Sequence, residues 1–94
     1  WCEAKGVARA ASAEEVAQQS DVVIVLAPDN IEAHLDLCRS VFPAAAGKRV
    51  MVDKFLATNV ADAGQILDLA RQNGVQVFSA SALRFAVEVE AALA

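Results

Sequence analysis

Residues 22–26 form an unbroken apolar run, Val-Val-Ile-Val-Leu, dominated by β-branched side chains. Such a run is typical of a strand that is covered on both faces, as in a parallel sheet, because no polar residue marks a face toward solvent. The run is strand-sized and falls well short of the roughly 18 apolar residues that a membrane span needs. We therefore expect a buried central strand and no membrane partner.

Short apolar runs alternate with longer amphipathic stretches along all 94 residues. A helical turn at residues 1–5, closed by Gly6, precedes them. Helices are expected after each apolar run, the last at residues 87–93. The predicted strands are residues 7–10, 22–26, 49–52 and 75–78.

Capping residues and helix breakers mark the helix boundaries. Ser12 and Glu15 have the spacing of a capping box, which predicts a helix that runs to about Gln19. The other predicted caps and stops are Asp29, Pro43, Thr58 or Asn59, and Gly74. The predicted apolar faces of the two central helices are Ile31, Leu35, Cys38 and Phe42, then Val60, Ala63, Leu67 and Ala70.

This order of elements predicts the α/β class: a parallel sheet with right-handed crossovers and helices on both faces. Polar residues follow three successive strands, at 28–30, at Asp53-Lys54 and at 79–84. The carboxyl ends of parallel strands open on one edge of the sheet, where such folds bind ligands. That edge is the predicted functional site.

Asp53 and Lys54 end a buried strand, which is an unfavourable place for charge unless the charge is paired or used. Neighbouring side chains on an extended chain point to opposite faces, so the two should have different roles. Lys54 could orient a substrate hydroxyl or carry a proton, because a partly desolvated lysine gives up its proton more readily. A salt bridge at the rim of the sheet explains the pair equally well.

The remaining polar residues near strand ends each have a structural explanation beside a functional one. Pro28, Asp29 and Asn30 fit a capped strand-to-helix turn, and such a turn also presents free N–H groups to a ligand. Arg84 is either a surface arginine between core residues or a contact for an anion or a ribose. Ser79 and Ser81 have no nearby base, so they do not support serine nucleophile chemistry.

Several functional classes are disfavoured by composition. The net charge of −4 without any cluster of basic residues argues against nucleic acid as a partner. His34 is the sole histidine and lies inside a predicted helix, so a partly buried helix residue is favoured over a metal ligand and no metal site is predicted. Cys2 and Cys38 favour free thiols over a disulfide, which, with no signal peptide in evidence, indicates a cytoplasmic location.

Three ordered segments, "DVVIVLAPDN", "GKRVMVDKFLATN" and "GVQVFSASALRF", resemble the Gfo/Idh/MocA family of oxidoreductases. The family's middle segment usually reads Gly-Lys-x-Val-x-x-Glu-Lys-Pro-Leu-Ala-x-Thr, and Asp53 stands here in the place of the glutamate. The last segment is similar to a branch with Ser-x-Ser-Ala-Leu-Arg-Tyr/Phe. The resemblance covers nearly the whole chain, and the matching positions of the middle segment are Gly47, Lys48, Val50, Lys54, Leu56, Ala57 and Thr58.

The resemblance implies a Rossmann domain that binds NAD or NADP, in an enzyme that transfers a hydride between nicotinamide and a hydroxyl or carbonyl of a sugar or polyol. By position, Lys54 would be the catalytic lysine facing the nicotinamide and the reacting carbon, and Asp53 would lie near the nicotinamide ribose. Arg84 would lie near the floor of the active site. The residues lining the cofactor would be Ala27, Pro28 and Asn30. The parent protein is expected to be a homo-oligomer.

The chain departs from the family pattern in three respects. Phe55 replaces the usual proline, which puts the cis peptide supported by that proline in doubt, because cis bonds before other residues are rare. The spacing from Pro28 to His34 exceeds the common Pro-Asn-x-x-His form, so no role passes to His34. No Gly-x-Gly-x-x-Gly is present. Residues 1–94 are thus expected to be a partial Rossmann domain, with the glycine loop upstream and the substrate domain downstream.

Two alternatives to an oxidoreductase stay open at this stage. Some relatives bind the dinucleotide and regulate transcription without turnover, and a chance resemblance of another small-molecule-binding α/β module would leave the fold intact. As a piece, the chain is expected to be inactive and to bind NAD weakly or not at all, because the phosphate site would lie outside it.

Overall fold

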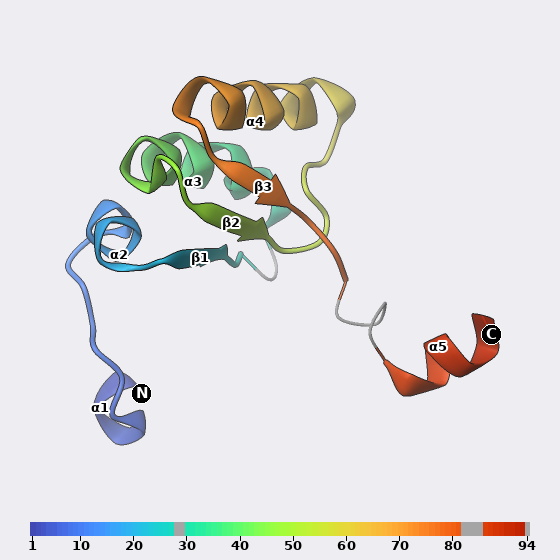
Figure 1. Ribbon diagram of the computed structural model, residues 1–94, viewed down its shortest axis with the longest axis horizontal. Coiled ribbons are helices and arrows are strands. Elements are labelled where there is room, and N and C mark those ends of the chain that lie inside the picture. The colour runs from blue at the N-terminus through green and yellow to red at the C-terminus, as the bar shows by residue number, and fades with distance from the viewer. Residues whose placement is uncertain (28–29, 82–85, 94) are drawn as a thin grey trace.

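The computed structural model describes residues 1–27, 30–81 and 86–93. Three strands and a series of helices alternate along the chain (Figure 1). Most predicted elements are present with their bounds shifted by a few residues at most. In order, the elements are α1 (Cys2–Lys5), α2 (Ala13–Gln19), β1 (Val22–Val25), the 3₁₀ helix η1 (Ile31–Ala33), α3 (His34–Val41), the 3₁₀ helix η2 (Phe42–Ala45), β2 (Arg49–Val52), α4 (Val60–Asn73), β3 (Gln76–Phe78) and α5 (Val87–Leu93).

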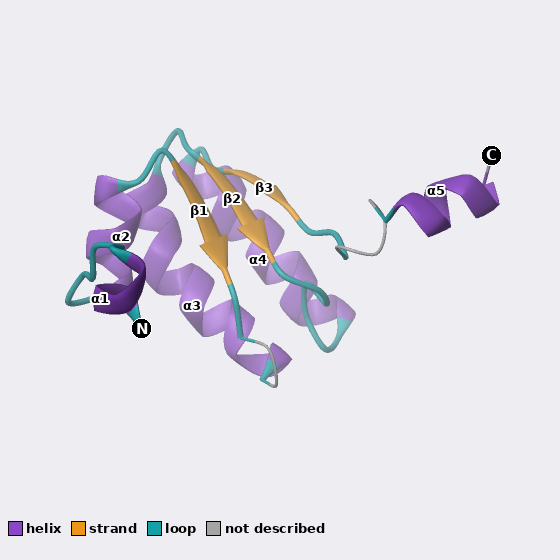
Figure 2. Ribbon diagram, turned by 90° about the horizontal axis from the view of Figure 1, so that it is seen from below, coloured by secondary structure: helices purple, strands orange, loops and turns teal. Residues whose placement is uncertain are grey.

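The strands form one parallel sheet in the order β1-β2-β3. Val22 pairs with Arg49 at the start of β1, and Arg49 pairs with Gln76 on the other side of β2. All three strands therefore point the same way, and α2, α3 and α4 form a layer against one face of the sheet (Figure 2). This arrangement confirms the predicted α/β, Rossmann-like class.

The core lies between the sheet and this helical layer. Alternate residues of β1 are buried and exposed, so Val23 and Val25 face the helices. The other buried members are Ala17, Leu35, Cys38, Val41, Phe42, Ala45, Val50, Val52, Ile66, Ala70 and Val75. Burial of this apolar surface is what holds the two layers together.

The opposite face of the sheet is open within the described residues, although the apolar run predicts cover on both faces. Val22, Ile24 and Leu26 are exposed on that face of the first strand region, and Phe78 is exposed on β3. A continuous apolar run makes a strand suitable for burial on both faces, but burial also needs a packing layer on each face. The described helices supply one such layer.

Residues 7–10 form no strand, contrary to prediction. Their backbone lies in a loop after α1, and the described strands offer them no pairing partner. A strand exists only where a neighbour accepts and donates its backbone hydrogen bonds.

Helices α1 and α5 lie apart from the sheet and its helical layer (Figure 1).

The caps show how local sequence sets helix starts. The Oγ of Ser12 accepts from the N–H of Glu15 at 3.1 Å, as the capping box predicts, while the Glu15 carboxylate accepts from the N–H of Ala11 at 2.8 Å. Asn59, not Thr58, caps α4, its Oδ1 accepting from Asp62 N–H at 2.8 Å. The predicted cap Asp29 lies outside the described residues.

The predicted apolar stripe of α4 is right at Ala70 and wrong at Val60 and Leu67. Val60 is 89% exposed and Leu67 is exposed, whereas Ile66 and Ala70 are buried. The true stripe is rotated by about one residue from the predicted one. Alanines at several positions let two stripes fit the helical period, and only the place of the helix on the sheet decides between them.

The amino edge of the sheet is joined by hydrogen bonds between the turns that precede β2 and β3. Gly47 N–H donates to the carbonyl of Gly74 at 3.1 Å, and both glycines have positive φ, 77° and 65°. Lys48 Nζ donates to the carbonyls of Ala17 and Gln18 at the end of α2, at 2.6 and 3.0 Å. Lysine ammonium groups stabilise the free carbonyls of a helix end in this way.

Two further features bear on function. Among the described helices, none has the length and apolar character that crossing a bilayer requires. Both cysteines are free, with Cys38 buried, and burial raises the pKa of its thiol to about 12.

Candidate functional site

The parallel register brings the ends of β1 and β2 together at one edge of the sheet. Val25 pairs with Val52, and the N–H of Asp53 donates to the carbonyl of Val25 at 3.0 Å. The chain after β1 and the chain after β2 therefore leave the sheet side by side (Figure 2). We call this edge, with Ala27, Asn30, Asp53 and Lys54, the carboxyl edge.

Asp53 is half-buried and Lys54 is exposed at the carboxyl edge. In the described part of the chain, ion pairs join Arg39 to Asp36 and Arg71 to Asp68, and none involves Asp53 or Lys54. The rim salt bridge considered from sequence is thus not formed there. Lys54 is exposed to solvent, so the described residues do not provide the partial desolvation that the sequence analysis expects around its ammonium group.

The turn after β1 is built by main-chain hydrogen bonds. Asn30 N–H donates to the carbonyl of Ala27 at 3.0 Å, and Ala33 N–H donates to the carbonyl of Asn30 at 3.1 Å. The side chain of Asn30 is exposed and makes no capping hydrogen bond. Its amide is therefore available to a ligand. Of the other predicted site residues, Pro28 and Arg84 lie outside the described residues.

The loop after Lys54 has an unexpected backbone and an unexpected partner. The Lys54–Phe55 peptide bond is cis although Phe55 is not proline, so the doubt raised by the sequence does not apply to this structure. His34 Nδ1 lies 2.8 Å from the carbonyl oxygen of Phe55 and 3.2 Å from that of Leu56. The imidazole thus connects the start of α3 to the loop that carries Lys54.

His34 is a residue to which the sequence analysis gives no role. Its side chain is fully buried, and its Nε2 has no hydrogen-bond partner among the described residues. A signal for it exists in the sequence, since His34 lies one helical turn before buried Cys38 on the same face. A polar residue on an apolar stripe usually has a buried hydrogen-bond partner.

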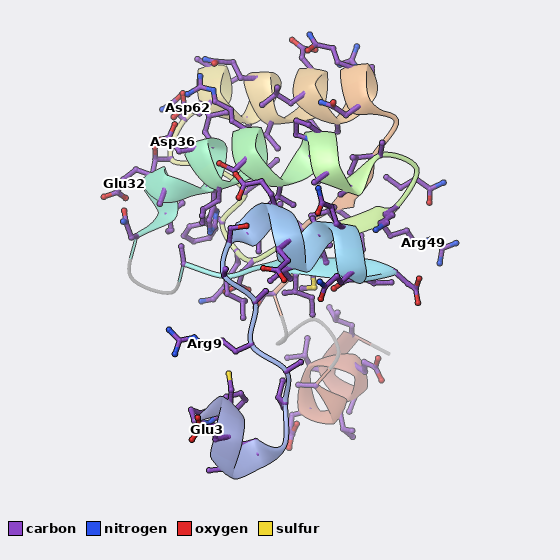
Figure 3. The ribbon with its side chains drawn as sticks, turned by 90° about the vertical axis from the view of Figure 1, so that its left-hand side faces the viewer. Glu3, Arg9, Glu32, Asp36, Arg49 and Asp62 are labelled. Carbon is purple, nitrogen blue, oxygen red and sulfur yellow. The ribbon has the colours of Figure 1, made fainter. Side chains whose placement is uncertain are left out.

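Acidic side chains occupy the helix starts beside the carboxyl edge. Glu32 lies in the first turn of η1, Asp36 in the first turn of α3 and Asp62 in the first turn of α4 (Figure 3). Carboxylates stabilise these positive helix ends and repel a phosphate from them. The edge therefore suits a neutral or hydroxyl-rich ligand group better than a pyrophosphate.

An apolar hollow of about 210 Å³ lies along β1 and includes Val25 and Leu26 at the carboxyl end of that strand. Every lining residue is aliphatic, so the hollow offers no group for catalysis or for polar recognition. The lining residues are Ala13, Val16, Val23, Ile24, Val25, Leu26, Leu37 and Val41.

Comparison with known proteins gives a clear family match. A model described as an oxidoreductase family with an NAD-binding Rossmann fold, GFO_IDH_MocA, matches residues 1–81. No curated protein matches the chain.

Solved structures of oxidoreductases also resemble it. One from Klebsiella pneumoniae is 27% identical with a TM-score of 0.62 and covers 80% of this chain. One from Bacillus cereus is 30% identical with a TM-score of 0.62 and covers 82%. One from Bacteroides fragilis is 20% identical with a TM-score of 0.71 and covers 97% of this chain. At this identity the likeness shows a shared fold. This chain spans 21% of the first two proteins and 29% of the third.

Proposed function

Because the chain belongs to the Gfo/Idh/MocA family of oxidoreductases, which has an NAD-binding Rossmann fold, we propose that the protein carrying it transfers a hydride between nicotinamide and a sugar or polyol. The observation that carries the proposal is the meeting of Asp53 and Lys54 with the turn after β1 at the carboxyl edge. Ligands of open α/β sheets bind at this edge. The family supports a nicotinamide dinucleotide as cofactor, either NAD or NADP.

The residues of the carboxyl edge fit the nicotinamide half of such a cofactor. The half-buried carboxylate of Asp53 can accept hydrogen bonds from ribose hydroxyls, and the small side chain of Ala27 leaves room for close approach. The exposed amide of Asn30 supplies both a donor and an acceptor. The acidic helix starts do not fit the phosphates, which would be held by other residues.

We assign the chemical role to Lys54. The chemistry that the dinucleotide supplies when bound is the acceptance or return of a hydride. In the oxidation direction, the substrate's C–H bond breaks with its electron pair leaving as hydride to the nicotinamide, and the hydroxyl proton passes to solvent water as the C=O bond forms. The Lys54 ammonium group donates a hydrogen bond to that oxygen and stabilises the negative charge that develops on it. Pro28 and Arg84 remain predicted contacts.

The test uses the protein that carries this chain together with its flanking sequence. Absorbance of reduced nicotinamide is followed against a panel of sugars and cyclitols, and cofactor binding is measured by calorimetry. We expect turnover with at least one polyol. Lys54→Met should lower kcat by on the order of 100- to 10,000-fold, while Lys5→Met on the distant α1 should not change it.

The other outcomes are equally informative. No binding of NAD or NADP by the extended protein would refute the proposal. Binding without turnover on any member of the panel would favour the alternative of a dinucleotide-binding sensor or regulator.

A further inference from the structure

The hydrogen bonds of His34 fix the tautomer of its ring. Both groups within reach of Nδ1 are carbonyl oxygens, those of Phe55 and Leu56, at 2.8 and 3.2 Å. A carbonyl accepts and never donates, so Nδ1 must carry the proton. In the neutral ring, Nε2 then carries the lone pair, and Nε2 is buried without a partner among the described residues.

The position of these two carbonyls gives the contact its significance. They belong to the two residues that directly follow Lys54, and the N–H of Asp53 is held by Val25. The chain around Lys54 is thus held on one side by the sheet and on the other by the imidazole. Lys54 itself is exposed and has no ion pair in the described part of the chain. Its location is therefore set by its backbone.

We propose that His34 is a positioning residue for Lys54. Its Nδ1–H holds the carbonyls of Phe55 and Leu56 and so places the Lys54 ammonium group at the carboxyl edge. The inference rests on the proposed function for its catalytic consequence, because a positioned lysine matters to turnover only if Lys54 acts on substrate. A misplacement of about 1 Å at a reacting group can reduce the rate by on the order of 100-fold.

The first measurement concerns the ring and needs no activity. Nitrogen-15 NMR of the protein with its flanking sequence, with His34 assigned by its loss in His34→Asn, distinguishes the two tautomers. We expect a pyrrole-type Nδ1 and a pyridine-type Nε2. A protonated Nε2 with a bare Nδ1 would overturn the proposal, and the tautomer itself is read from the wild-type protein.

The second measurement compares variants that keep or remove the donor. The amide nitrogen of asparagine can take the place of Nδ1, whereas leucine fills the space without a donor. At saturating cofactor, His34→Leu should lower kcat by about 100-fold and His34→Asn should restore it to within about tenfold of the wild type. Cys38→Ala, a buried change one turn further along α3 at a residue that makes no hydrogen bond to the loop, is the matched control and should leave kcat within about twofold of the wild type.

The third measurement separates positioning from catalysis. Lys54 is labelled by reductive methylation with ¹³C-formaldehyde, and its methyl resonance is assigned by its loss in Lys54→Arg. We expect this resonance to shift in His34→Leu and to stay in place in Cys38→Ala. If it shifts while the wild type neither binds nor reduces a nicotinamide, the proposed function fails and the positioning role stands. An unmoved resonance, or an equal loss of kcat in Cys38→Ala, refutes the positioning role.

Discussion

Ile66 and Leu67 are neighbours on α4, yet the side chain of Ile66 is fully buried and that of Leu67 is 43% exposed. Ile66→Ala should therefore lower the free energy of unfolding by about 2–5 kcal/mol, since it leaves a cavity under the helix. Leu67→Ala should change it by no more than about 0.5 kcal/mol. Urea unfolding followed by circular dichroism measures both, and equal losses would mean that the stripe of α4 is placed wrongly.

The cap of α4 gives a second prediction. Asn59 Oδ1 accepts from Asp62 N–H at 2.8 Å. Asn59→Ala removes this acceptor and should lower the free energy of unfolding by about 1 kcal/mol. Asn59→Asp retains an acceptor at a positive helix end and should preserve stability. Thr58→Ala removes only the hydroxyl that accepts from Asn59 Nδ2 at 3.3 Å, so it should lower the free energy of unfolding less, and a loss as large as that of Asn59→Ala would contradict the assignment.

Lys48 gives a third prediction, at the opposite edge. Its Nζ donates to the carbonyls of Ala17 and Gln18, so Lys48→Met should destabilise the fold by on the order of 1 kcal/mol. The same change at Lys5 removes an equal charge without such contacts. If the two variants lose the same stability in thermal unfolding, the effect is one of net charge alone.

Cys38 predicts a dependence of stability on pH. Burial raises the pKa of its thiol from 9.0 to about 12. Between these values the unfolded chain loses the proton while the folded chain keeps it, so the unfolded state binds fewer protons and stability falls as pH rises. The contribution is fully present below about pH 9 and is lost toward pH 12. Cys38→Ala should flatten this part of the profile, as measured by urea unfolding at a series of pH values.

Asp53 gives a prediction for the cofactor. On the proposed function, Asp53 accepts a hydrogen bond from a ribose hydroxyl, so Asp53→Asn in the protein with its flanking sequence should weaken nicotinamide dinucleotide binding by about 10- to 100-fold. Asp21→Asn makes the same chemical change just before β1, at the other end of the strand. Calorimetry that finds equal weakening in both variants would remove Asp53 from the binding site.

The sequence predicts the strands and helix ends well, because local chemistry decides them. Local residues determine the strand in the run at residues 22–26, and they also determine the two ends of α4, where Asn59 is the N-cap and Gly74 the C-cap. The predicted strand at residues 7–10 fails for the opposite reason, since pairing depends on a neighbour that sequence alone cannot supply. The phase of α4 fails because two stripes fit the same helix.

In the candidate site too, one relationship follows from the sequence and another does not. Strand ends in a parallel sheet must meet, so the juxtaposition of Asp53 with the turn after β1 follows from the order of elements. The contact of His34 with Phe55 does not, because it joins residues 21 positions apart through a main-chain oxygen. Any residue at position 55 offers the same main-chain oxygen, so the identity of that residue carries no sign of the contact.

The hydrogen bonds at the amino edge have a consequence for how such a protein can evolve. Gly47, Gly74 and Lys48 join the turns before β2 and β3 and the end of α2 at the edge far from the candidate site. Strand register is thus maintained where no ligand is expected. Side chains in the turns at the carboxyl edge can therefore be exchanged without re-pairing the strands.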